Sequence, residues 1–342
     1  MKLKLPKKQA ENNSSRKSER ERVEERREEI LARGRKFKYP LQYAKHKLVV
    51  NTIIIAVLLV VGLVVAGWAA LYKFQDMRDI MYRISYVTRI PVAEIDGKKV
   101  RFFDYLMTAR SSLTTLRQQS GVENNSEDEK AMINRYKRTA LTQAEDLTYA
   151  LKLGEENGIE VSKEEVAQSF DEHRKVGGTE RSEESFLKVL STNFGLNKTE
   201  YERMLYLALM KVKVEEEIDI DAKKVAEEVR VKLGQNGGDF AKTREELGER
   251  VQFETTGGLV DSKNVDGGRA GVAMKLNPGQ ISEKFLSSNG DGYYFVKLIE
   301  KTEDRVNYES LFVKFTEFDK RLEEVRDNGR VKEYIKLVET EE

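Results

Sequence analysis

The 342-residue sequence contains no cysteine and only two histidines, His46 and His173. The lack of cysteine excludes a disulfide framework, a cysteine-ligated zinc or iron–sulfur centre and a cysteine nucleophile. Two histidines argue against a histidine-rich metal site and against a Ser-His-Asp triad. We therefore expect no metal ion and no cofactor.

The net charge of the whole chain is also close to zero, because two parts of opposite charge cancel. The formal net charge is +1, yet residues 1–47 carry 16 Lys and Arg against 7 Asp and Glu, a local +9. The remaining residues carry 44 against 52, a local −8. The length allows about two domains plus connecting parts. The basic tail and the acidic remainder are thus distinct parts of the chain.

Charged residues are also missing from residues 48–71, LVVNTIIIAVLLVVGLVVAGWAAL. At ~1.5 Å per residue a helix of this length extends roughly 36 Å, enough to cross a hydrocarbon core of about 30 Å. The apolar part of a cleaved signal peptide is shorter, about 7–15 residues. The stretch therefore predicts a single retained transmembrane helix, with Trp68 and Tyr72 in an interfacial aromatic belt.

The charges that flank this stretch predict its orientation. Six basic residues precede it, whereas Asp76 and Asp79 offset the basic residues that follow. The six are Arg33, Arg35, Lys36, Lys38, Lys45 and Lys47. The positive-inside rule then places the N-terminus in the cytoplasm and the C-terminal domains outside the cell membrane. A cysteine-free outer region favours a bacterial cell envelope over an oxidising secretory route.

The cytoplasmic tail, residues 1–47, has a helix-prone charged run at residues 16–35. It is open to three interpretations: binding to anionic lipid, binding to nucleic acid or the ribosome, or a solvated tail that only sets topology. Acidic residues are interleaved throughout the run, which favours the third. We therefore expect membrane lipid as a partner, through the one membrane helix, and do not expect nucleic acid. Nothing in the sequence bears on oligomeric state.

Residues 72–218 predict a mainly α-helical domain. Residues 91–103 contain two short strands around Asp96-Gly97, the dipeptide that hairpins favour. Several helices follow, and three of them begin at capping boxes: Ser126 with Glu129, Ser162 with Glu165 and Asn197 with Glu200. In the last helix the spacing predicts five inward-facing residues: Tyr201, Leu205, Ala208, Leu209 and Val212.

The order of these elements resembles a known family. The hairpin PVAEIDGKKVRFFDY, the helix end ALKLGEENGIEVSKEEVAQSF and the closing helix FGLNKTEYERMLYLALMKVKVEEEI look like the SurA-type N-terminal chaperone domain of envelope foldases, which include PrsA and PpiD. The resemblance covers residues 92–218. It implies an anchored extracytoplasmic chaperone whose partners are unfolded or newly translocated polypeptides.

Residues 219–315 resemble a second family, the parvulin-type prolyl isomerases, and imply a small α+β domain. Four short motifs occur in that family's order: GGDFA, GGL at 257–259, LNPGQIS at 276–282 and GDGYYFVKLIEK at 290–301. The family's polar site positions are substituted here. Tyr294 and Ser310 stand at its two histidine positions, and Glu249 is the acid nearest to its Asp or Cys position.

The resemblance therefore implies Tyr294, Ser310 and Glu249 as candidate catalytic residues. Met274, Leu276 and Phe285 are candidate substrate-binding residues that would line an apolar pocket for proline. Because the polar positions are substituted, prolyl isomerase activity is itself in question.

The position of one strand stays open. The family's first strand is missing before residue 223, and residues 306–315, VNYESLFVKF, resemble it. Since the family's first and last strands are antiparallel neighbours, a hairpin after residues 290–301 would supply the strand in a circularly permuted order. The alternative places this strand beside the hairpin at residues 91–103. Residues 316–342 are expected to form a terminal helix over 318–338, interrupted by Gly329.

Three functions remain open at this level. The first is a membrane-anchored chaperone or foldase, the second an active prolyl isomerase with a rearranged site, and the third an envelope scaffold that binds one fixed partner.

Overall fold

The computed structural model describes residues 8–119, 127–176 and 179–337. The chain divides into two compact units, residues 1–69 and 70–342. Every buried apolar side chain found in the described part of the chain belongs to the second unit, beginning with Leu71.

The first unit is one long helix, α1 (Lys8–Trp68). The segment His46–Lys73, which comprises the end of α1 and the turn after it, contains an 18-residue window with a mean hydropathy of 3.1 and no buried residue. By length and composition this segment is compatible with a single membrane span. The charged run of the basic tail, residues 16–35, lies within α1 and is therefore helical as well.

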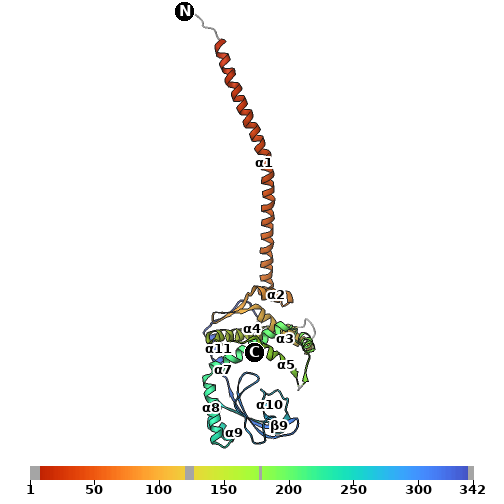
Figure 1. The fold of residues 1–342 in the computed structure, drawn as a ribbon, viewed down its shortest axis with the longest axis vertical. Helices are drawn as coiled ribbons and strands as arrows, with labels where there is room; N and C mark the ends of the chain where they lie inside the picture. The colour runs from red at the N-terminus through yellow and green to blue at the C-terminus, as the bar shows by residue number, and fades with distance from the viewer. Residues whose placement is uncertain (1–7, 120–126, 177–178, 338–342) are drawn as a thin grey trace, which may run out of the picture. The chain divides into compact units, whose positions relative to one another are not determined.

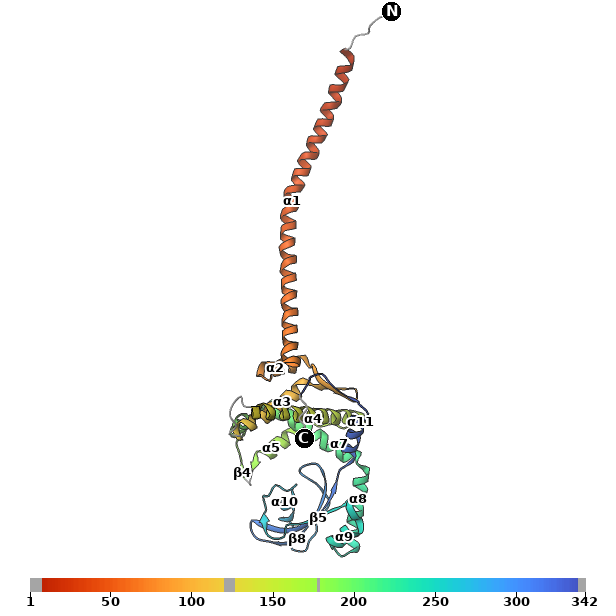
Figure 2. The same cartoon turned by 180° about the vertical axis from the view of Figure 1, so that it is seen from behind.

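The second unit has two lobes (Figures 1 and 2). We call residues 70–218 and 316–337 the helical lobe and residues 219–315 the sheet lobe. The helical lobe begins within the π-helical turn η1 (Ala69–Lys73). Its other helices are α2 (Asp79–Thr88), α3 (Phe102–Gln119), α4 (Glu127–Asn157), α5 (Lys163–His173), α6 (Glu183–Val189), η2 (Leu190–Phe194), α7 (Lys198–Ile218) and α11 (Glu317–Asp327). Its strands are β1 (Pro91–Ile95), β2 (Lys98–Arg101), β3 (Lys175–Val176), β4 (Thr179–Glu180) and β10 (Val331–Glu333).

Local sequence signals account for much of the helical lobe. Asp96 and Gly97 both have positive φ angles, 47° and 80°, as the tight turn between β1 and β2 requires. Two of the three predicted capping boxes are formed: the Ser162 and Asn197 side chains each accept a backbone N–H three residues on, and Glu165 and Glu200 reach back. Ser126, the first residue of the third box, lies outside the described residues. These caps satisfy backbone donors that the first helical turn leaves unpaired.

The sheet lobe is an antiparallel sheet with helices on both faces. Its helices are α8 (Ile220–Gln235), α9 (Phe240–Leu247), η3 (Gly248–Arg250) and α10 (Arg269–Ala273). Its strands are β5 (Gln252–Thr255), β6 (Val260–Asp261), β7 (Phe285–Leu286), β8 (Gly292–Lys301) and β9 (Arg305–Lys314), in the order β5-β9-β8-β7 with β6 also on β9. Alternate residues face opposite sides: Phe295 and Leu311 pack with α8 and α9, whereas Val296 and Leu298 pack with α10.

The strand whose position the sequence left open lies at the centre of this sheet. β9 pairs with β8 over most of its length and with β5 on its other side, and it does not pair with the hairpin of β1 and β2. Without β9, both β5 and β8 would have an unpaired edge in the lobe interior.

The expectation of one terminal helix over residues 318–338 is wrong in its second half. The helix α11 ends at Asp327, and the chain turns at Gly329, whose φ is +64°. β10 then pairs antiparallel with β1, Val331 opposite Ile95. The open edge of β1 offers backbone partners that a helix could not use, so tertiary pairing prevails over helix propensity. Val338 lies outside the described residues.

Two side chains near the core need comment. Tyr72, predicted for an aromatic belt, also contributes to the helical lobe: its hydroxyl donates to the Pro91 carbonyl at 2.5 Å and its ring packs edge-on against Phe102. Ala208 is exposed, and its neighbour Leu207 is buried instead. α7 is covered on more than one side, so a single-stripe pattern does not describe it.

The two lobes meet around the α7–α8 junction. The Tyr293 hydroxyl of β8 donates to Glu216 of α7 at 3.1 Å. Gly290, in the turn before β8, lies directly against Val212, where a Cβ atom would overlap the valine side chain. The lobes are therefore joined by contacts that a single added methyl group would disturb.

Candidate functional site

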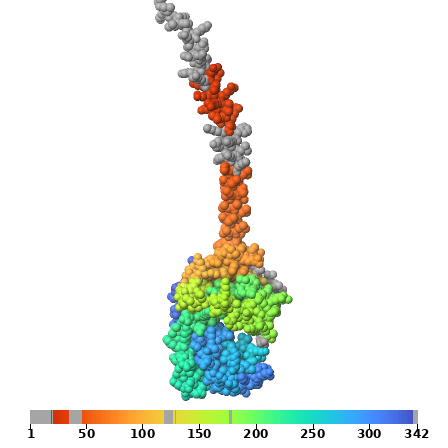
Figure 3. Space-filling model, in the orientation of Figure 1, coloured from red at the N-terminus to blue at the C-terminus, as the bar shows by residue number. Residues whose placement is uncertain are grey.

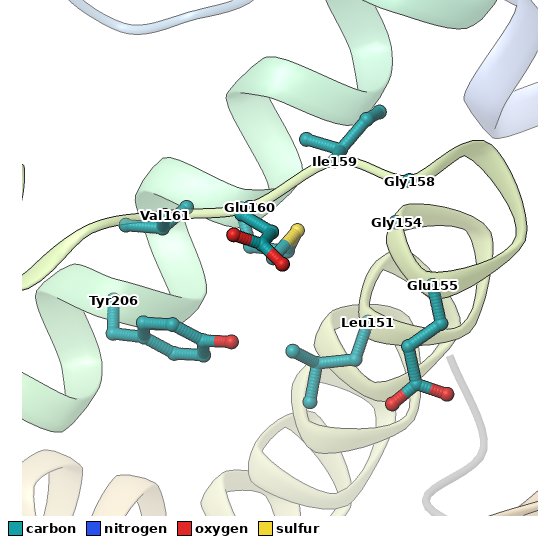
Figure 4. A pocket seen from close by; sticks show the side chains of 9 residues that line it. Leu151, Gly154, Glu155, Gly158, Ile159, Glu160, Val161 and Tyr206 are labelled. Atoms are coloured by element: carbon teal, nitrogen blue, oxygen red, sulfur yellow. The ribbon is translucent and has the colours of Figure 1, made fainter.

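An open pocket of about 450 Å³ lies in the helical lobe, where the end of α4 and the segment after it meet α7. In Figure 4 the ring of Tyr206 extends from α7 toward Leu151 of α4, and Glu160 projects from the connecting segment above them. Apolar side chains, two glycines and two carboxylates make up the lining: Leu151, Gly154, Glu155, Gly158, Ile159, Glu160, Val161, Tyr206 and Met210. The pocket thus offers apolar surface beside negative charge.

Backbone turns at the end of α4 shape this pocket. Gly158 ends the helix with a φ of +66°, and the Ile159 amide donates back to the Gly154 carbonyl at 2.8 Å. Gly154 is itself a point of close packing, since a Cβ atom there would lie 2.5 Å from the Met210 sulfur. α4 and α7 approach closely at Gly154. The pocket lies beside this contact, and the segment after Gly158 passes over it.

Lysine 213 fixes the connecting segment over the pocket. Its ammonium donates to the Glu160 carbonyl at 2.8 Å and pairs with Glu165 at 2.5 Å. Hydrogen bonds from Lys213 and from Ser162 lower the pKa of Glu165 to about 2, so this carboxyl stays charged. Glu160 and Glu155 remain exposed at the pocket, and Glu155 pairs with Lys98.

Tyr294 and Ser310, two of the predicted catalytic residues, lie on the same face of the sheet in the sheet lobe. Tyr294 stands opposite Phe312 and Ser310 opposite Val296, two residues away along each strand. Arg269 of α10 connects them: its guanidinium lies 4.9 Å from the centre of the Tyr294 ring and donates to Ser310 Oγ at 3.2 Å. Burial raises the pKa of the Tyr294 hydroxyl, which therefore stays protonated.

The third predicted catalytic residue, Glu249, is not part of this group. It is exposed in η3, which follows α9 on the other face of the sheet. The acid beside Ser310 is Glu254 of β5, which stands opposite it and forms an ion pair with Arg269. Arg269 also donates from Nε to the Asp266 carbonyl at 2.7 Å, so its Nε and Nη1 atoms are both bonded within the lobe.

The predicted substrate-binding residues lie mainly in the core of the sheet lobe, and one of them, Phe285, lies beside Tyr294. Leu276 is 8% exposed, and Met274 and Phe285 pack against the same apolar cluster beneath α10. The Phe285 ring lies 6.0 Å from that of Tyr294. These side chains contribute chiefly to packing, with Met274 and Phe285 partly reaching the surface.

Sequence reasoning missed Arg269 and Glu254. Arg269 and Glu254 come together because α10 packs on β8 and β9, and β5, which carries Glu254, is the neighbour of β9. No local sequence pattern specifies this packing. Gly267-Gly268 immediately before Arg269 was the available signal: a Cβ at Gly267 would contact the Tyr294 ring, so this backbone runs against the site. Within the described ranges, no group of three or more acidic or histidine side chains is placed to hold a metal ion.

Residues 41–215 match the family model of the SurA-like N-terminal domain. The chain belongs to this family. The match spans more than half of the 342 residues and contains every residue that lines the pocket. A comparison with curated proteins found no match.

The SurA-like domain indicates a chaperone-type function and is consistent with binding of unfolded polypeptides. The match begins in α1 and ends within α7, so it excludes the sheet lobe with Tyr294, Ser310 and Arg269. The pocket, not the sheet-lobe group, is therefore the candidate site that the family match includes.

Proposed function

We propose that this protein is a membrane-anchored chaperone that binds unfolded or newly translocated polypeptides outside the cytoplasm. The SurA-like domain supports the chaperone function, and the single apolar helix supports the anchor. The basic residues before that helix support a cytoplasmic N-terminus.

The pocket is the single observation that carries this proposal. A chaperone must bind many sequences through adaptable apolar contacts, without any reactive group. Leu151, Ile159 and Val161 present such surface, and Met210 adds a flexible side chain that tolerates different shapes. Glu155 and Glu160 would favour client segments that carry a basic residue next to an apolar one.

Suppression of aggregation tests this proposal. Residues 70–342, the unit that contains the buried core, should keep several unrelated unfolded proteins soluble. Ile159→Asp should weaken this about tenfold, since a pocket contact worth ~1–2 kcal/mol is lost. Ile220→Asp makes the same change at a residue 52% exposed, outside the pocket, and should have no effect. Circular dichroism melting of both variants would show whether each is folded.

Equal activity of the two variants would contradict the pocket as the client site. Binding of one folded partner with no effect on unfolded proteins would favour an envelope scaffold instead.

A second candidate function is prolyl isomerisation by the sheet lobe, which we propose is a permuted parvulin-like domain. The antiparallel pairing of β8 with β9 supports it, since that family's first and last strands are neighbours. A catalyst need only bind the twisted imide better than either planar form, against a barrier of about 20 kcal/mol. The Arg269 donors that would serve this purpose are bonded to Glu254 and Ser310, which supports weak activity at most.

A proline-peptide isomerisation assay on residues 70–342 distinguishes the two functions. Acceleration that Tyr294→Ala abolishes and Ile159→Asp leaves unchanged would establish the isomerase. A rate equal to the uncatalysed one, with intact suppression of aggregation, is the result expected for a chaperone alone.

A further inference from the structure

An exposed apolar surface lies on α2 and on the turn between η1 and α2, and we call it the α2 surface. It contains Phe74, Ile80, Tyr86 and Val87, which are 70%, 57%, 49% and 78% exposed. Figure 3 shows the orange segment that contains α2 at the surface of its unit. The other large apolar residues exposed in the described part of this unit are scattered: Phe194, Ile220, Val231, Val265 and Ile299.

Hydrogen bonds hold both ends of this segment next to the end of the apolar span. The Asp76 amide donates to the Ala70 carbonyl at 2.9 Å, so the chain turns back within six residues. The bond from the Tyr72 hydroxyl to the Pro91 carbonyl brings the far end of the segment to the same place. α2 therefore belongs to a loop whose two ends bond to Ala70 and Tyr72, which follow Trp68, the last residue of α1, by two and four positions.

α2 itself has two distinct faces. Met81 and Ser85 are buried against the helical lobe, 9% and 0% exposed. Ile80, Arg83 and Val87 lie on the opposite side at helical spacing, and all three are exposed. An apolar stripe that includes a basic residue is the pattern of helices that lie in a membrane interface.

The charge around this stripe favours anionic lipid. Lys73, Arg78, Arg83 and Arg89 are exposed, and the segment contains two acidic residues. One of these, Asp76, hydrogen-bonds the Arg78 guanidinium at 2.8 Å. The segment is basic, although the chain beyond residue 47 is acidic as a whole.

We propose that the α2 surface lies in the outer membrane–water interface, with Phe74, Ile80 and Val87 among the acyl chains and Arg83 at anionic headgroups. This inference rests on the proposed membrane anchor, which brings the surface to the bilayer. Contact at a second point would restrict rotation and tilt of the helical lobe at the membrane. The pocket would then be held at a fixed height above the bilayer.

The absence of cysteine permits a direct test in the full-length chain. Phe74→Cys, Ile80→Cys and Val87→Cys each create a single thiol for an environment-sensitive fluorophore. The labelled chains are reconstituted into phosphatidylcholine vesicles with and without phosphatidylglycerol, and with nitroxide-bearing lipid as quencher. Val265→Cys, at a loop residue 94% exposed, is the matched water-facing control, and Val57→Cys reports on the span.

The proposal predicts blue-shifted, lipid-quenched emission at 74, 80 and 87, deeper quenching at 57 and none at 265. Adding Arg83→Glu to Val87→Cys should reduce quenching in anionic vesicles. Quenching at 57 with a water-like signal at 87 would overturn the α2 proposal and leave the anchor intact. Loss of quenching at 57 as well would overturn both. Disulfide-linked dimers of Val87→Cys in place of lipid quenching would assign the surface to a second copy, which also contradicts the proposal.

Discussion

The Asp219 carboxylate accepts the backbone N–H of Thr316 at 2.7 Å, although 97 positions separate the two residues. The same oxygen accepts the N–H of Glu317 at 3.1 Å, and the other oxygen accepts that of Ala222 at 2.8 Å. One side chain, 2% exposed, therefore caps both α8 and α11. These helices begin where the chain enters and leaves the sheet lobe, so Asp219 ties the two crossings together.

Asp219→Ala should lower the free energy of unfolding of residues 70–342 by about 2–3 kcal/mol, since each lost cap costs about 1 kcal/mol and the site is buried. Urea unfolding measures this loss. Asp239→Ala is the matched control: Asp239 caps α9 alone, accepting the Lys242 N–H at 2.9 Å, and its loss should cost about 1 kcal/mol. Equal losses for the two variants would show that Asp219 does not act at both helices.

Gly290→Ala should weaken the packing between the helical lobe and the sheet lobe. The new methyl group would overlap Val212, and the φ of +76° at this position is itself unfavourable for alanine. We expect a loss of about 2–3 kcal/mol of stability, from overpacking together with backbone strain. Adding Val212→Ala should recover part of this loss, because it removes the overlap and leaves the strain. A double variant as unstable as the sum of both single variants would contradict this contact.

Glu145 of α4 should make stability depend on pH. It is 4% exposed, and its Oε1 atom accepts no hydrogen bond from the described part of the chain. Burial, reinforced by Glu333, raises the pKa of this carboxyl to about 7 from an ordinary 4.5. The folded chain therefore holds this proton more tightly than the unfolded chain does.

The free energy of unfolding should fall by ~2–3 kcal/mol between about pH 4.5 and about pH 7 because of this group. Glu145→Gln should flatten that part of the profile and raise stability at about pH 8, as measured by urea unfolding at each pH. Glu127→Gln, at an exposed residue of the same helix, is the control and should leave the profile unchanged. A Glu145→Gln profile that matches the parent would disprove the role of this carboxyl.

Arg269→Gln should reduce stability by about 2 kcal/mol, since it removes an ion pair, a hydrogen bond to Ser310 and the contact with the Tyr294 ring. Arg250 is a suitable comparison, because it pairs with Glu228 at 2.8 Å with both side chains about half exposed. Arg250→Gln should cost under about 1 kcal/mol. Thermal unfolding of both variants checks the difference, and similar values would place Arg269 outside the packed core.

Short-range rules were sufficient for much of the helical lobe. The turn at Asp96-Gly97 and the caps at Ser162 and Asn197 formed as expected, because each depends on residues within a few positions of one another. The SurA-like resemblance, predicted over residues 92–218, was confirmed by the family match, which covers residues 41–215.

Long-range relationships were not predictable in the same way. β10 is a strand only because β1, more than 200 residues earlier, presents an open edge. Similarly, Glu254 rather than Glu249 faces Ser310, since the register between β5 and β9 decides which acid lies there. No local spacing could reveal that Asp219 also caps a helix that begins at Glu317.

Photo-crosslinking in cells tests the proposed function most directly. A photoreactive residue in place of Tyr206 of the full-length chain, with newly made proteins pulse-labelled, reports what enters the pocket. We predict crosslinks to many different exported polypeptides soon after synthesis, and none from the same residue placed at Val265. Crosslinks only to cytoplasmic proteins, to one folded partner, or to nothing would contradict an anchored chaperone that acts outside the cytoplasm.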